Sequence, residues 1–143
     1  MKFEKLFESK NHKLYKVSGE EVPITPKMAV PLKWSDVEGE EEQYNEAFLA
    51  SFRDLLKGFE EKGEFVFVEP VYDKNANPGQ FTAAMKHTSR RIKDCACVIG
   101  FALPEQVVSD VEVAQDFIEK LSEKHPQYVY FAKNASDERI VLY

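Results

Sequence analysis

The sequence predicts a single α/β domain, residues 1–143, with a mostly parallel β-sheet of four to six strands and three main helices. One observation is the apolar run from Cys95 to Leu103, which only Gly100 interrupts and which is typical of a strand buried on both faces. Another is the alternation of strand-like and helix-like segments with short connections, which favours parallel strands joined by helices. Two layouts fit this pattern: a curled, half-barrel-like sheet with helices on one face, or a flat, flavodoxin-like sheet with helices on both.

The first part of the chain predicts the least regular structure. Its earliest apolar residues predict a short amphipathic helix: Phe3, Leu6 and Phe7. Residues 13–17 alternate between polar and apolar side chains, which indicates a half-buried strand at a sheet edge. Residues 28–34 predict a second strand. Pro31 makes it an edge strand or a bulged one, because proline donates no hydrogen bond to a neighbouring strand.

The remaining elements follow in regular alternation. Apolar residues that recur every three or four positions predict three helices, at 41–62, 79–94 and 110–125. Runs of apolar residues predict four further strands, at 65–68, 95–103, 128–132 and 140–142. Strand 95–103 should lie in the interior of the sheet. Either 13–17 or 139–142 should form an edge, which need not be parallel to its neighbour.

The composition and charge exclude several classes of protein. The formal net charge of −6 argues against nucleic acid as a partner, since phosphate recognition requires a positive surface. No apolar run approaches the ~20 residues that a membrane span requires, so no membrane association is expected. No signal peptide is visible at the start of the sequence, and the expected location is therefore the cytoplasm.

The sequence motifs predict neither a cofactor nor a metal. The glycines match neither the dinucleotide-binding pattern nor the phosphate-binding loop. Cys95 and Cys97 are the only cysteines, and no CxxC pair or neighbouring histidine accompanies them, as a zinc site would require. We expect two buried thiols on one face of the predicted strand, too poorly placed to form a disulfide.

Polar and aromatic side chains follow the carboxyl ends of the predicted strands, where ligands bind in parallel α/β sheets. The predicted ligand-binding residues are Lys33, Trp34, Glu69, Tyr72 and Glu105. Glu69 and Glu105 follow neighbouring strands, and two carboxylates separated by roughly 5–9 Å would suit acid–base hydrolysis. A structural role competes with each assignment: the two glutamates could pair with Lys33 or Lys133, and Trp34 could fill the rim of the core.

Two short motifs stand at the junctions between helices and strands. Glu61-Lys62-Gly63 precedes the strand Phe65–Val68, and Ser89–Asp94 precedes Val98-Ile99-Gly100-Phe101. Through these motifs, about residues 28–105 resemble family 5 glycoside hydrolases, which are (β/α)8 barrels. The resemblance places Gln106 at the position of the family's acid/base, and an amide cannot act as a general acid. It therefore implies a degenerate or half-barrel relative that has lost the family's chemistry.

The sequence thus favours a non-catalytic or degenerate glycosidase-like α/β module. It would bind a small ligand, with carbohydrate as one option, or a protein partner at the strand carboxyl ends, and no catalytic residue is assigned. One alternative is a small glycosidase-type hydrolase that uses Glu69 and Glu105. In that case two half-barrels could pair their exposed strand edges as a homodimer. A second alternative is an acidic protein–protein interaction domain that uses the Glu-rich loop 36–42.

Overall fold

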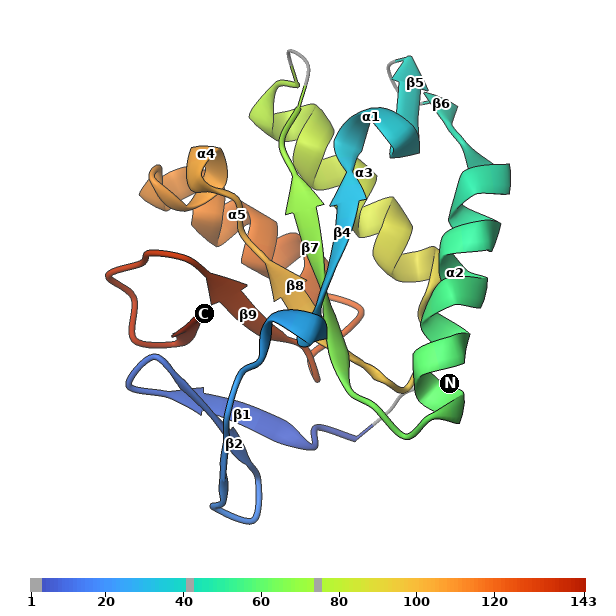
Figure 1. Cartoon of the computed structure of the whole chain (residues 1–143). Helices are drawn as coiled ribbons and strands as arrows, with labels where there is room; N and C mark the ends of the chain where they lie inside the picture. Colours follow the sequence, from blue (N-terminus) through green and yellow to red (C-terminus); the bar gives the residue numbers. More distant parts are fainter. Residues whose placement is uncertain (1–3, 41–42, 74–75) are drawn as a thin grey trace.

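The computed structural model describes residues 4–40, 43–73 and 76–143, and its main feature is a five-stranded parallel sheet (Figure 1). From one edge to the other its strands are β4 (Ala29–Lys33), β7 (Val66–Val71), β8 (Val98–Ala102), β9 (Val129–Ala132) and β10 (Ile140–Leu142). The predicted parallel α/β fold is confirmed, and β8 is the central strand as expected. Because the strands lie side by side in chain order, the flavodoxin-like alternative, with its 2-1-3-4-5 order, is wrong.

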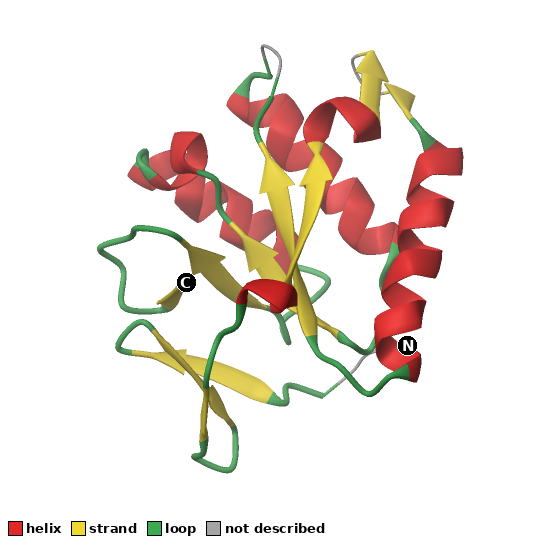
Figure 2. Cartoon of the chain, in the orientation of Figure 1, coloured by secondary structure: helices red, strands yellow, loops and turns green. Residues whose placement is uncertain are grey.

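Helices cover one face of this sheet, as a half-barrel requires (Figure 2). The long helices are α2 (Glu46–Glu61), α3 (Pro78–Arg91) and α5 (Val111–Ser122). The short ones are α1 (Trp34–Val37) and α4 (Glu105–Val108), whereas the 3₁₀ turn η1 (Pro26–Met28) packs through Met28 on the opposite face. The long helices bury apolar side chains, such as Leu56, Phe81 and Phe117, against the sheet residues Val68 and Phe101.

Helix α2 begins later than the predicted 41–62. The side chain of Asn45 accepts a hydrogen bond from the Phe48 amide and caps the helix. Before it, the short strands β5 (Glu38–Glu40) and β6 (Gln43–Tyr44) pair in antiparallel orientation. Positions 41 and 42 of the predicted helix, and of the Glu-rich loop 36–42, lie outside the described residues.

The opposite face of the main sheet is covered in part by a second, antiparallel sheet. Its strands are β1 (Phe7–Lys10), β2 (Lys13–Lys16) and β3 (Glu21–Val22), in that order. Phe7 and Leu14 pack there against Phe67, Ile99 and Phe131. The predicted amphipathic helix is wrong for Leu6 and Phe7, and Phe3 lies outside the described residues. Strand 13–17 is the middle of this small sheet and not an edge of the large one.

Strand β4 forms one edge of the main sheet, as Pro31 predicted. Pro31 lacks an N–H, and the N–H of Ala29 already donates to the carbonyl of Pro26. Few donors therefore remain on this edge for pairing with another strand.

Strand β10 forms the other edge and runs parallel to β9, although only residues 133–139 connect them. The turn between β1 and β2 covers this edge. The His12 carbonyl accepts from the Leu142 N–H at 3.0 Å, and His12 Nδ1 lies 3.0 Å from the Ile140 carbonyl oxygen. Asn11 and His12 reach this position with positive φ angles of 52° and 64°. Neither edge of the sheet is thus prepared to accept a further strand.

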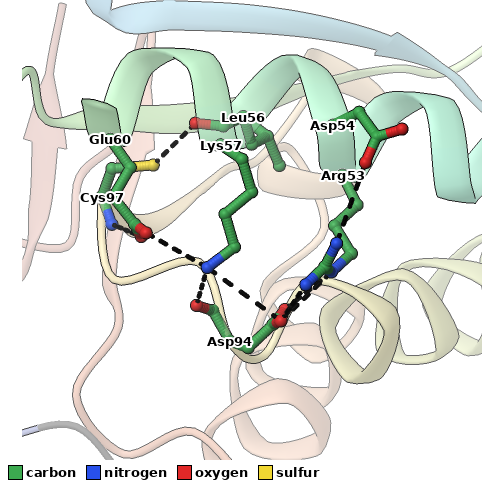
Figure 3. Close-up of polar contacts among 7 residues, drawn as sticks. All are labelled: Arg53, Asp54, Leu56, Lys57, Glu60, Asp94 and Cys97. Carbon is green, nitrogen blue, oxygen red and sulfur yellow. Dashed lines mark hydrogen bonds and ion pairs between the residues drawn. The ribbon is translucent and has the colours of Figure 1, made fainter. Parts of the chain in front are cut away.

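Two basic residues of α2 hold the turn that precedes β8 (Figure 3). Arg53 Nε donates to Asp94 Oδ1 at 3.0 Å, and Lys57 Nζ donates to the Asp94 carbonyl at 2.5 Å. The Arg53 guanidinium holds the pKa of the Asp94 carboxyl below its usual value, against the opposing effect of burial. These contacts fix where the central strand begins.

The two cysteines are buried free thiols, as predicted, but they lie in this turn before β8 and not on the strand. Cys97 Sγ donates to the Leu56 carbonyl of α2 at 3.2 Å. Burial raises the pKa of Cys95 to about 12 and that of Cys97 to about 11. Both thiols therefore stay protonated near neutral pH.

Acidification below about pH 6.5 should destabilise the fold through His125. This side chain is 7% exposed, and its Nε2 has no hydrogen-bond partner among the described residues. Burial and, secondarily, Lys93 lower its pKa. As the pH falls through this range, the unfolded chain therefore binds more protons than the folded chain does, and the fold loses stability. One such proton costs at most about 1.4 kcal/mol of stability per pH unit.

The free energy of unfolding, measured by urea denaturation between pH 7 and pH 5, would show this loss. A His125→Gln variant should show a flatter profile over the same range, because it removes the titrating group. An equal slope in both proteins would assign the pH dependence to other groups.

Over the described ranges, no helix combines the length and the apolar character that crossing a membrane would require.

Candidate functional site

A cleft of about 270 Å³ lies at the carboxyl ends of β7, β8 and β9, and we call it the strand-end cleft. Its polar and aromatic lining comes from four segments of the chain: Glu69, Tyr72, Glu105, Gln106, Lys133, Asn134 and Tyr143. Its apolar floor comes from Pro70, Ala102, Leu103 and Val108. This is the edge at which parallel α/β folds bind their ligands.

Glu69 is the half-buried carboxylate of this cleft. It follows Phe67 by two positions on β7, and therefore lies on the sheet face opposite the long helices. The hydroxyl of Tyr143 donates to Glu69 Oε2 at 2.5 Å, from just beyond the far edge strand β10. A carboxylate can accept about four hydrogen bonds, so this contact orients Glu69 and leaves acceptor capacity for a ligand.

Tyr143 is held by aromatic packing and by a cation over its ring. It makes a T-shaped contact with Phe67, with centroids 4.9 Å apart, and Phe67 stacks on Phe131 at 4.0 Å. Lys133 Nζ lies 3.8 Å from the centroid of the Tyr143 ring. Burial, and then the neighbouring Glu69 carboxylate, raise the pKa of Tyr143, so its hydroxyl remains a hydrogen-bond donor.

The structure brings three of the five predicted ligand-binding residues to the strand-end cleft: Glu69, Tyr72 and Glu105. Tyr72 lies with its ring against Phe81 and donates its hydroxyl to the Ala76 carbonyl at 2.6 Å. Its ring forms part of the cleft wall, and its hydroxyl already donates its hydrogen bond within the protein. Glu105 is exposed at the first position of α4.

Lys33 and Trp34 do not line this cleft. Trp34 begins α1, packs against the core and donates its indole N–H to Glu38 Oε2 at 3.1 Å. This is the structural role considered for it from the sequence. Lys33 is exposed at the end of β4, where its charge acts on Asp73.

Asp73 ties the segment that follows β7 to helix α1, which follows β4 directly. It accepts hydrogen bonds from the amide of Ser35, at 3.0 Å, and from the Ser35 hydroxyl. Burial alone would raise the pKa of Asp73, but these bonds outweigh that effect and hold the pKa below its usual value. Asp73 is thereby anchored to α1, next to the end of the edge strand β4.

Sequence reasoning missed Tyr143 and a second cleft. That cleft has a volume of about 440 Å³ and lies between η1, β4 and Tyr143. The alternation of β10 does place Tyr143 on the same face as Val141, but nothing in the pattern of residues shows that this face turns toward Glu69.

Comparison of the sequence with protein-family models gave no match, and no curated protein matched it either. Within the described ranges, no group of three or more His, Cys, Asp or Glu side chains is placed to hold a metal ion.

Proposed function

We propose that this protein binds a small polyhydroxylated ligand, a carbohydrate, in the strand-end cleft without hydrolysing it. One observation carries the proposal: the Glu69 carboxylate is half-buried in a cleft at the carboxyl ends of parallel strands, and Tyr143 fixes its orientation. The sequential sheet with helices on one face agrees with a half-barrel, and so with a degenerate relative of family 5 glycoside hydrolases.

The chemistry of the lining suits hydroxyl groups. Glu69 and Glu105 accept hydrogen bonds, Lys133 donates them, and the amides of Gln106 and Asn134 do both. The Tyr72 ring offers a flat apolar surface beside these groups. A few convergent polar groups over an apolar floor are typical of small-molecule sites.

Hydrolysis is less well supported by the same cleft. Gln106 has no proton to give as a general acid. Glu105 is exposed at the start of α4, outside an apolar pocket of the kind that surrounds the general acid of lysozyme. Glu69 is held by the Tyr143 hydroxyl, an arrangement that suits a fixed hydrogen-bond acceptor.

The Glu69→Gln variant should bind carbohydrate about 10- to 100-fold more weakly, because hydrogen bonds to a charged acceptor contribute about 1.5–3 kcal/mol each. Affinities would be measured by calorimetry with methyl glycosides of glucose, galactose, mannose and xylose in both anomers. Glu61→Gln is the matched control, since Glu61 is exposed at the end of α2, away from the cleft. Equal binding by the parent and by both variants would contradict the proposed site.

The hydrolase remains the second candidate, because Glu69 and Glu105 do line one cleft. It predicts release of 4-nitrophenol from 4-nitrophenyl glycosides, with activity lost in both Glu69→Gln and Glu105→Gln. The binding function predicts no release above the rate in buffer.

The protected edges of β4 and β10 oppose a barrel completed by edge pairing, so we infer that one copy of the chain is sufficient for binding. A protein-interaction role through loop 36–42 has less support, because Glu38 is buried and accepts from Trp34. A mass of one chain by light scattering, with and without ligand, is the expected result.

A further inference from the structure

The second cleft adjoins the strand-end cleft on the side of β4. The two clefts share three residues, Glu69, Lys133 and Tyr143, so both open beside the same hydrogen-bonded pair. The remaining lining of the second cleft is mostly apolar: Ile24, Thr25, Pro26, Ala29 and Pro31. We call it the apolar cleft.

The two clefts differ in chemistry on either side of the shared residues. Besides the shared residues, the strand-end cleft is lined by the polar side chains of Glu105, Gln106 and Asn134. Among the described residues, Thr25 is the single further polar side chain that lines the apolar cleft. A volume of about 440 Å³ is sufficient for a ring-sized group.

We propose that the ligand is a glycoside with an apolar substituent: the sugar lies in the strand-end cleft and the substituent in the apolar cleft. This inference rests on the proposed carbohydrate binding. A purely apolar occupant would cover the charged Glu69 and Lys133 without giving them polar partners, which is costly. A ligand with a polar and an apolar end satisfies both clefts at once.

The test compares matched glycosides of the same sugars by calorimetry. For at least one sugar, the 4-nitrophenyl glycoside should bind at least tenfold more tightly than the methyl glycoside, and tenfold corresponds to about 1.4 kcal/mol. Octyl glycosides separate an alkyl substituent from an aryl one, and whichever binds more tightly identifies the type of substituent. Free 4-nitrophenol should bind at least tenfold more weakly than its glycoside, because it lacks the sugar.

Two variants fill the apolar cleft: Ala29→Phe from β4 and Thr25→Trp from the loop before η1. Each should remove the advantage of the substituted glycosides and change methyl glycoside binding less than twofold. Val111→Phe places the same aromatic side chain as Ala29→Phe at an exposed position of α5 and should change neither. Thermal unfolding of each variant checks that the fold is intact. If one of the two filling variants does not fold, the other still tests the proposal.

The outcomes separate the two proposals. If methyl glycosides bind and substituted ones bind no more tightly, the apolar cleft is not a ligand site, although carbohydrate binding stands. Equal weakening of methyl and substituted glycosides by the filling variants would likewise exclude the apolar cleft as a ligand site. If no glycoside of any kind binds, the proposed function is wrong and this inference is wrong with it.

Discussion

The Gly100→Ala variant should be less stable than the parent chain by about 3–5 kcal/mol in the free energy of unfolding. Gly100 lies at the centre of β8, and a Cβ placed on it would lie 1.6 Å from the Val129 carbonyl oxygen and 2.7 Å from the carbonyl carbon. Both are backbone atoms of β9, so no side-chain rotation relieves the overlap. The two central strands would have to separate, and their parallel pairing would weaken.

The matched control for this substitution is Gly58→Ala. Gly58 lies inside α2, and a Cβ added there meets no atom within 4 Å. Alanine in a helix interior should make the protein more stable by about 0.5–1 kcal/mol. Urea denaturation of the two variants would show opposite shifts of the midpoint, and a Gly100→Ala midpoint close to that of the parent would contradict the close approach of β8 and β9.

The local pattern of residues was sufficient to predict the main sheet. The apolar run around Gly100 predicted a strand buried on both faces, and β8 is the central strand. Pro31 predicted an edge or a bulge, because a residue without an N–H cannot complete the pairing of a regular interior strand, and β4 is an edge. Such predictions hold because each depends on a property of a single strand.

Other features depend on contacts that no local pattern reveals. Phe7 looked helical beside Leu6, but it forms β1 because β2 and the exposed sheet face offer it a strand partner and an apolar surface. Cys95 and Cys97 belonged to the predicted strand, but Arg53 and Lys57 hold Asp94 in a turn that delays the start of β8.

In the candidate site, too, some features could be predicted from the local sequence and others could not. Glu69 and Glu105 could be placed in one cleft, because the carboxyl ends of neighbouring parallel strands meet at one edge. Trp34 was assigned to the site as well, but α1 turns it toward Glu38 and the core. Tyr143 was missed, because its contact with Glu69 depends on the position of β10 three strands away.

The Phe67→Ala variant should be less stable by about 3–5 kcal/mol, and the less disruptive Phe67→Leu by about 1–2 kcal/mol. Phe67 is fully buried, stacks on Phe131 and supports the ring of Tyr143. Truncation to alanine leaves a cavity beneath Tyr143, which then loses the contact that aims its hydroxyl at Glu69. The proposed carbohydrate binding should therefore weaken together with stability, although Phe67 lines neither cleft.

Phe65→Ala distinguishes this effect from the loss of any aromatic residue near β7. Phe65 is 40% exposed and meets Phe7 edge-on at 5.0 Å, at the end of the sheet opposite the strand-end cleft. Its removal should cost less stability and leave glycoside binding unchanged. The Phe67→Leu variant remains folded enough for calorimetry, and it should bind the methyl glycoside several-fold more weakly than Phe65→Ala does. If Phe67→Leu binds as tightly as the parent chain, Tyr143 does not depend on the aromatic layer below it, and Glu69 alone positions its hydroxyl.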